Sequence, residues 1–161
     1  MTVATPEQIS ATTTLQQRYI DALDQQDMQA WLGLFNTDGE YRLTSQENIE
    51  QDLPLSLMLD DCHERLVDRV KFVDEVWGHT VENYQSRHML QPVSVTPTDN
   101  GELEVRTNFT VFYTSHEGNT GLLVTGQYQD QVAIDGDNML FRSKLAVMDT
   151  AVSPRYIIYP I

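Results

Sequence analysis

The sequence predicts a single α+β domain in which N-terminal helices pack on a strongly curved, mostly antiparallel sheet, giving a cone-like shape. Apolar residues recur every three or four positions through the first 70 residues, and from residue 72 onward they recur at every second position. Tight turns separate the alternating segments, as is typical of an antiparallel meander. A chain of 161 residues, 40% of them hydrophobic, has the size of one domain with one core.

The first helix is predicted to begin close to the N-terminal end of the chain. Thr5 is a suitable N-cap, Pro6 suits the first helical position, and Gln8 completes a capping-box pattern. We nevertheless interpret about residues 1–12 as a loose N-terminal extension. The domain itself is expected to span residues 1–161, because the sequence contains no linker and no internal repeat.

A second, short helix and a short strand should follow the first helix. Asp27 can cap this second helix, which carries Trp31 among its apolar residues. Asn36–Gly39 is a cluster of turn-forming residues, and Tyr41 and Leu43 then alternate as they would in a strand. The sequence therefore predicts helix, turn and strand in this order.

Residues 46–58, around Pro54, mix polar residues with apolar ones. The leucines in this segment are expected to pack against another surface, because a row of apolar side chains is rarely left in water. Further along, Phe72–Trp77 lies where the apolar spacing changes, and we predict a short strand there.

The stretch Asp60–His63 combines four side chains of types that can bind a metal or move a proton. The same stretch also has the features of an ordinary helix start. Cys62 and Leu66 share one stripe of an amphipathic helix, so Cys62 should face the core. Asp60 and Asp61 would lie in the first turn, where negative charge interacts favourably with the helix dipole. We therefore predict a structural helix here, with catalysis as the alternative.

The second half of the chain is predicted to form long strands joined by short turns. A strand should begin at His88, and the Asn-Gly pair within 98–101 is a strong hairpin signal. Two further strands are predicted over 103–113 and 122–134. In the last strand, the residues predicted to share one face are Met139, Phe141, Ser143, Leu145 and Val147.

The C-terminal segment Pro154–Ile161 is mostly apolar or aromatic. Such a segment should pack either on its own domain or on a partner. Tyr156 and Ile161 are therefore candidates for packing or interface residues.

The charge balance excludes several classes of function. Ten basic residues stand against 24 acidic ones, a net charge of −14, and no Lys/Arg run is present. Nucleic-acid binding needs a basic face, and an anionic membrane surface would repel this chain, so we expect neither partner. The single cysteine and the lack of a signal-peptide pattern lead us to expect a cytoplasmic protein.

The neighbouring residues Arg87 and His88 should point to opposite faces of a strand. One interpretation makes His88 an acid or base in a pocket. The interpretation we favour is a buried, hydrogen-bonded histidine, with Arg87 paired to a carboxylate.

A catalytic pocket is an alternative interpretation of several residues that lie far apart in the sequence. Tyrosines and neutralised aspartates can form an oxyanion hole beside a second, basic aspartate. A stand-alone isomerase or dehydratase would use such a pocket, and a small-molecule or peptide binding module is a further alternative. The candidate residues are Tyr41, Tyr113, Tyr128, Asp60, Asp61 and Asp130.

Two groups of motifs resemble a known family. YIDALDQQDMQAWLGLFNTDGEYRL resembles the opening of the cone-shaped fold shared by nuclear transport factor 2 and ketosteroid isomerase. YRLTSQEN, PLSLMLDD, LVDRV, SRHMLQPVSV, FTVFYTS, GQYQDQV and FRSKLAVMDT are similar, in order and spacing, to the small (β) subunit of bacterial aromatic-ring-hydroxylating dioxygenases. The YR-x-T-x-x-EN pattern and the IYPI ending are most similar to small subunits that act on carboxylated aromatic compounds.

This resemblance implies a non-catalytic, structural small subunit of an oxidoreductase for the catabolism of aromatic compounds. The implied partner is a large (α) subunit that carries a Rieske [2Fe–2S] centre and a mononuclear Fe(II), in an α3β3 hexamer with the small subunits associated as a trimer. A Rieske centre takes two Cys and two His, whereas this chain has one Cys. No cofactor, metal or catalytic residue is therefore expected in this chain.

The resemblance also implies roles for individual residues in packing, buried ion pairs and subunit contacts, including a polar network near the last strand that involves Arg142 and Asp149. The residues that match the pattern of the family are Arg69, Arg87, His88, Tyr128, Arg142 and Asp149.

Overall fold

The computed structural model describes residues 3–78 and 82–161. Helices dominate the first part of the chain, and the second part is almost entirely strand. In chain order, the elements are α1 (Pro6–Asp24), α2 (Met28–Leu32), β1 (Phe35–Ser45), α3 (Gln46–Glu50), β2 (Met58–Asp60), α4 (His63–Phe72), the π-helical turn η1 (Val73–Trp77), β3 (Gln85–Pro97), β4 (Leu103–Thr114), β5 (Thr120–Asp135) and β6 (Asn138–Met148).

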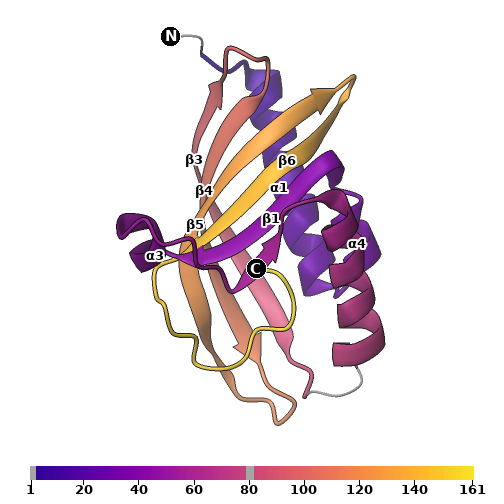
Figure 1. Ribbon diagram of the computed structural model, residues 1–161, viewed down its shortest axis with the longest axis vertical. Helices are drawn as coiled ribbons and strands as arrows, with labels where there is room; N and C mark the ends of the chain where they lie inside the picture. Colours follow the sequence, from indigo (N-terminus) through magenta and orange to yellow (C-terminus); the bar gives the residue numbers. More distant parts are fainter. Residues whose placement is uncertain (1–2, 79–81) are drawn as a thin grey trace.

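All six strands join one sheet in the order β2-β1-β6-β5-β4-β3, which Figure 1 shows as a twisted, strongly curved layer. β3 to β6 form the predicted antiparallel meander, whereas β1 runs parallel to β6. α1 packs against β3 and β6, and α4 packs against β1 and β2. Their apolar sides share one core with the inner face of the sheet, so the predicted fold class is confirmed.

The N-terminal helix begins where the capping pattern predicts. The Thr5 side chain accepts a hydrogen bond from the Gln8 amide, and the Gln8 side chain accepts one from the Thr5 amide. Helical structure starts at Pro6, and Thr12 is only 1% exposed. A loose extension reaching residue 12 is therefore wrong, because the capped helix carries this part of the chain onto the sheet.

The predicted strand at Phe72–Trp77 is also wrong. α4 continues through Phe72 and ends in η1. Val70 and Val73 are 1% exposed and lie three residues apart, which is helical spacing, while Phe72 and Trp77 are exposed. The helical period therefore continues past residue 70, and the short run of apolar residues was too ambiguous to separate helix from strand.

The residues predicted to form a turn before the first strand lie inside β1 instead. Phe35 already pairs with Phe141, and the next pair is Glu40 with Ser143. The three extra residues on the β1 side leave the ladder as a bulge. The segment Asn36–Gly39 therefore forms a bulge within a strand instead of a turn before it.

A bulge in β6 reverses which side chains face the core. Val132 pairs with Phe141, whereas Gln131 pairs with Ser143, so Arg142 is the extra residue. Beyond this point the even-numbered side chains point inward, and Lys144 is fully buried. The predicted inward face of the last strand is thus correct at Phe141 and wrong at Ser143, because one inserted residue moves every later side chain to the other face.

Candidate functional site

A pair of opposite charges lies fully buried under α1. Lys144 on β6 is 0% exposed, and its Nζ lies 2.9 Å from Oδ2 of Asp130 on β5. Gln16 of α1 completes the cluster, because its amide donates to Asp130 at 2.6 Å and its carbonyl oxygen accepts from Lys144 at 2.9 Å. The three side chains therefore tie one helix and two strands together inside the core.

Aromatic rings surround the ammonium group of Lys144. The Nζ atom lies 3.6 Å from the ring centroid of Tyr128, 4.2 Å from that of Tyr19 and 4.4 Å from that of Phe141. Ring faces attract a desolvated cation, so this cage compensates part of the lost hydration.

Burial has the largest effect on the pKa values of Lys144 and Asp130. Burial lowers the pKa of Lys144 to about 8, against the opposing charge of Asp130. Burial likewise raises the pKa of Asp130, against the charge and hydrogen bond of Lys144. Within the described residues, the Tyr128 hydroxyl and Oδ1 of Asp130 have no hydrogen-bond partner. The cluster is buried, and its two charged groups bind each other and Gln16.

His88 is buried and hydrogen-bonded, as the favoured interpretation predicts. Its Nδ1 lies 2.6 Å from Oδ1 of Asp24 at the C-terminal end of α1, and its main-chain amide donates to Oδ2 of the same carboxylate at 3.1 Å. Ser86 donates a third hydrogen bond to Asp24, at 3.0 Å. Asp24 thus anchors the end of α1 to the start of β3.

The expected carboxylate partner of Arg87 is absent from the described residues. The Arg87 side chain is exposed, and Nη1 donates to the carbonyl oxygen of Ser86 at 3.3 Å. This difference follows from strand alternation, which turns Arg87 outward when His88 points into the core.

A structural helix begins within the stretch Asp60–His63 as predicted, but Asp60 and Asp61 lie before its first turn. Asp60 is the last residue of β2, and α4 begins at His63 with Cys62 as its N-cap. Asp60 is 5% exposed and forms a two-point ion pair with Arg69 of α4, with N–O distances of 2.8 and 3.0 Å. Cys62 is only half-buried. The carboxylate therefore joins a strand to a helix, which gives it a structural partner.

The C-terminal segment packs on its own domain. Ile161 is 1% exposed, and its main-chain oxygen accepts hydrogen bonds from the hydroxyls of Tyr19 (2.8 Å) and Tyr41 (3.2 Å). Further back, the Ile158 amide donates to the hydroxyl of Tyr84 at 3.3 Å. Ile158 and Ile161 are therefore part of the buried core.

Arg155 holds this segment in place from its other end. The guanidinium lies 4.8 to 4.9 Å from the ring centroids of three tyrosines, and it reaches a Glu82 carboxylate at 3.7 Å. Tyr156 is 42% exposed, and its hydroxyl donates to the carbonyl oxygen of Glu82 at 2.9 Å. The three tyrosines are Tyr84, Tyr113 and Tyr156.

The polar network expected at the last strand is two separate contacts. Arg142 Nε lies 3.5 Å from a carboxylate oxygen of Glu102, whereas Asp149 accepts a hydrogen bond from Thr125 at 2.7 Å. Arg142 lies at the bulge within β6, whereas Asp149 follows the last residue of the strand. The length of the strand keeps the two side chains apart.

The alternative pocket of tyrosines and aspartates does not assemble. Asp60 binds Arg69, Asp130 binds Lys144, and the hydroxyl of Tyr41 binds Ile161. Asp61 pairs with Arg65, so the three aspartates and the Tyr41 hydroxyl already have partners from the same chain. The Tyr128 hydroxyl has no hydrogen-bond partner among the described residues, but the Tyr128 side chain is fully buried beside Lys144.

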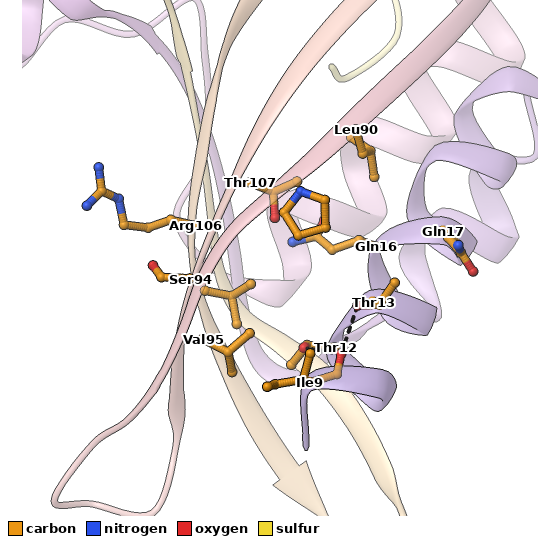
Figure 2. A pocket seen from close by; sticks show the side chains of 12 residues that line it. Ile9, Thr12, Thr13, Gln16, Gln17, Leu90, Ser94, Val95, Arg106 and Thr107 are labelled. Atoms are coloured by element: carbon orange, nitrogen blue, oxygen red, sulfur yellow. Dashed lines mark hydrogen bonds between the residues drawn. The ribbon is translucent and has the colours of Figure 1, made fainter. Parts of the chain in front are cut away.

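A separate cavity of about 120 Å³ opens between α1 and strands β3 and β4. Figure 2 shows Ile9, Leu90 and Val95 around it, with Arg106 extending away from it. Gln16 also lines the cavity, but its amide is taken by the buried pair. The cavity is therefore an apolar groove without a group suited to proton transfer.

Within residues 3–78 and 82–161, no three His, Cys, Asp or Glu side chains are grouped so that they could hold a metal ion. None of the helices in these ranges is long and apolar enough to cross a membrane.

The model of the ring hydroxylating beta subunit family matches residues 18–155. The chain belongs to this family. It is thus the small subunit of an aromatic-ring-hydroxylating oxygenase, which confirms the family that its motifs resemble.

Relatives with known activities support this placement. The chain is 28% identical over 137 residues to the small subunit of anthranilate 1,2-dioxygenase from Burkholderia cepacia, covering 85% of this chain and 84% of the relative. It is 25% identical over 143 residues to a terminal oxygenase β subunit of terephthalate 1,2-dioxygenase from Comamonas sp., covering 89% and 92%.

Solved structures share the fold. A protein assigned as the β subunit of an aromatic-ring-hydroxylating dioxygenase from Novosphingobium aromaticivorans superposes with a TM-score of 0.79 at 26% identity, covering 89% of this chain and 90% of that one. The β subunit of benzoate 1,2-dioxygenase from Burkholderia mallei gives 0.71 at 21% identity, covering 92% of both chains. ActVI-ORFA from Streptomyces coelicolor gives 0.67 at 15% identity, covering 88% and 96%, and shows the same fold alone.

Sequence reasoning missed Lys144, Gln16, Asp24 and Arg155. Lys144 was hidden by the β6 bulge, and Gln16 and Asp24 lie on a helix where polar residues are ordinary. One residue in the sequence could have indicated the buried cluster. Alternation places Asp130 on the inward face of β5, and a buried carboxylate needs a buried partner.

Proposed function

We propose that this small subunit supports an oxygenase that hydroxylates a carboxylated aromatic ring in the cytoplasm. Its relatives are named for anthranilate and terephthalate, which are both carboxylated aromatic compounds. The family match over residues 18–155 carries the proposal. The interior agrees with it, because the buried Asp60 and Asp130 and the hydroxyls of Tyr19 and Tyr41 bind partners within the chain.

The oxygen chemistry then belongs to the large subunit. That subunit would carry the Rieske [2Fe–2S] centre and the mononuclear Fe(II). A Rieske centre needs two Cys and two His, and this chain contributes one Cys in total. The residues present therefore do not fit the group, and this chain would act by holding the iron-carrying subunit in its assembled form.

The expected assembly has three large and three small subunits, with the small subunits in contact as a trimer. The outer face of the sheet suits contact between copies, because its central strands carry Asn108, Gln127, Gln129 and Gln131 rather than a row of carboxylates. With a net charge of −14 per chain, copies can approach only through a face of low charge.

Co-expression tests the proposal directly. This chain would carry an affinity tag, and the neighbouring large-subunit gene would be expressed beside it. We expect iron–sulfur protein to co-purify in a near-equal ratio, and the complex to oxidise anthranilate, terephthalate or benzoate in preference to an uncharged ring such as toluene. A colourless protein that retains no partner would contradict the proposal.

A further inference from the structure

The segment after α3 exposes leucine at every second position. In Figure 1, the chain turns at α3 and returns along β1 to β2, the edge strand of the sheet. Main-chain and side-chain contacts hold this return, since the Leu57 amide donates to the Leu43 carbonyl and Thr44 donates to the Leu55 carbonyl. The four exposed leucines, here called the leucine stripe, are Leu53 (38%), Leu55 (57%), Leu57 (49%) and Leu59 (45%).

The stripe lies on the side of the edge strand that faces away from the core. Met58 and Asp60 are only 6% and 5% exposed, and Asp60 pairs with the fully buried Tyr41. Leu59 instead pairs with Arg42, whose side chain is on the opposite face of β1 from Tyr41. Because of this alternation, Met58 and Asp60 pack against the domain, whereas the leucines on the other side are exposed.

Exposed acidic residues precede and follow the stripe in the sequence. Glu47, Glu50, Asp52 and Asp61 are exposed, and the sequence has no Lys or Arg between Arg42 and Arg65. Arg42 also lies beside the stripe, where it donates to the Ser56 hydroxyl and to the Leu55 carbonyl, so the border is mostly, though not entirely, acidic. An apolar row with a mostly acidic border is typical of an interface whose partner has an apolar patch with basic residues around it.

We propose that the leucine stripe is the surface that binds the large oxygenase subunit, through an apolar patch bordered by Lys and Arg on that subunit. This inference rests on the proposed function, because it takes that subunit as the partner. A second copy of this chain fits the stripe poorly. Two stripes in contact would bring together two acidic borders, each on a chain with a net charge of −14.

Charged variants of the stripe provide the test. Leu55→Glu and Leu57→Glu would each be co-expressed with the large subunit and purified through a tag on this chain. We expect about tenfold less large subunit retained per small subunit, because a carboxylate would be buried against an apolar patch. Leu122→Glu is the matched control, since Leu122 is 50% exposed on β5, and it should retain the partner as the wild type does.

A second pair of variants tests the acidic border without placing a charge in the stripe. Glu50→Lys and Asp52→Lys should reduce retention by about threefold at low salt, and the difference should shrink near about 0.5 M salt, where charges are screened. Thermal unfolding of each variant alone verifies that it is folded.

The outcomes separate the inference from the proposed function. If the wild type retains no iron-carrying subunit, the proposed function fails and the inference fails with it. If the wild type retains that subunit and folded Leu55→Glu and Leu57→Glu retain it equally, the stripe is not the docking surface. Loss of self-association with normal retention of the large subunit would assign the stripe to contacts between copies, and would also overturn the inference.

Discussion

At the scale of single residues, the buried pair of Lys144 and Asp130 has the largest energetic consequence. Both side chains are 0% exposed, so each charge depends on the other, on Gln16 and on the ring cage. Taking two charges out of water is costly, and the pair offsets that cost only while both partners are present.

Lys144→Ala should therefore destabilise the domain by about 3–5 kcal/mol, because it leaves Asp130 buried without a counter-charge. Urea unfolding measures the loss. Arg65→Ala is the control, since Arg65 and Asp61 form an ion pair at 3.4 Å with both side chains about half exposed, and such surface pairs contribute about 0.2–1 kcal/mol. A loss below about 1 kcal/mol for Lys144→Ala would mean that the pair is not ionised.

Asp24 makes stability depend on pH in the acid range. Burial raises the pKa of Asp24, but the hydrogen bonds and charge of His88, with a further hydrogen bond from Ser86, outweigh it and hold the pKa below its usual value of 3.8. The carboxylate therefore stabilises the fold above pH 3.8, and this contribution is lost as the pH falls through the lowered pKa.

Asp24→Asn should flatten the acid side of the stability profile. The melting temperature of the wild type would be compared with that of the variant between pH 7 and pH 2. The variant should be less stable at neutral pH and should lose less on acidification, while Ser86→Ala should lie between the two. Parallel profiles for wild type and Asp24→Asn would show that Asp24 is not the titrating group.

At the scale of elements, the C-terminal segment belongs to the core rather than to an interface. Ile158 and Ile161 are 7% and 1% exposed, and main-chain groups of both residues bind tyrosine hydroxyls. The apolar composition of the segment by itself fits a partner surface equally well. Tyr156 is the part of the segment that remains accessible for such a contact.

Deleting residues 157–161 should lower the free energy of unfolding by about 3–5 kcal/mol, since burying one large apolar side chain contributes about 1.5–3 kcal/mol. Thermal and urea unfolding of the isolated chain measure this loss. Val152→Ala, at a residue that is 76% exposed, is the control and should change stability little. An unchanged stability after the deletion, with assembly weakened instead, would place the segment in an interface.

Two elements were mispredicted for the same reason. The bulges in β1 and β6 insert residues into a ladder, and a single insertion reverses the side chains that follow. Alternation predicted the inward residues correctly over 103–111 of β4 and 124–132 of β5, since these two parts pair with each other without a shift. The register shifts after Val111, and Leu122, which alternation places inward, is 50% exposed.

At the scale of the whole molecule, charge limits how copies can associate. The net charge of −14 opposes contact between chains, and salt screens that repulsion. The polar outer face of the sheet and the leucine stripe offer two different surfaces, one suited to like chains and one to a basic partner.

The isolated chain should therefore associate more strongly as salt increases. Sedimentation equilibrium between about 0.05 and 0.5 M salt should show the mass rising from that of one chain, 18.4 kDa, toward three times that value. A mass that stays at one chain under all conditions would contradict a trimer of small subunits alone, and a mass that falls with salt would show that ion pairs hold the copies together.

The sequence by itself determined the fold class, the capped first helix, the antiparallel meander and the family, because these depend on local spacing and on motifs in order. It also excluded a Rieske centre within this chain, because one cysteine cannot supply two. Only the tertiary structure decided the polar partners inside the core. Gln16 forms hydrogen bonds with Asp130 and Lys144, which lie 114 and 128 residues further along the chain. Ile161 accepts a hydrogen bond from Tyr19, which lies 142 residues earlier. Such contacts depend on strand register, bulges and the path of the last residues, and no local pattern records them.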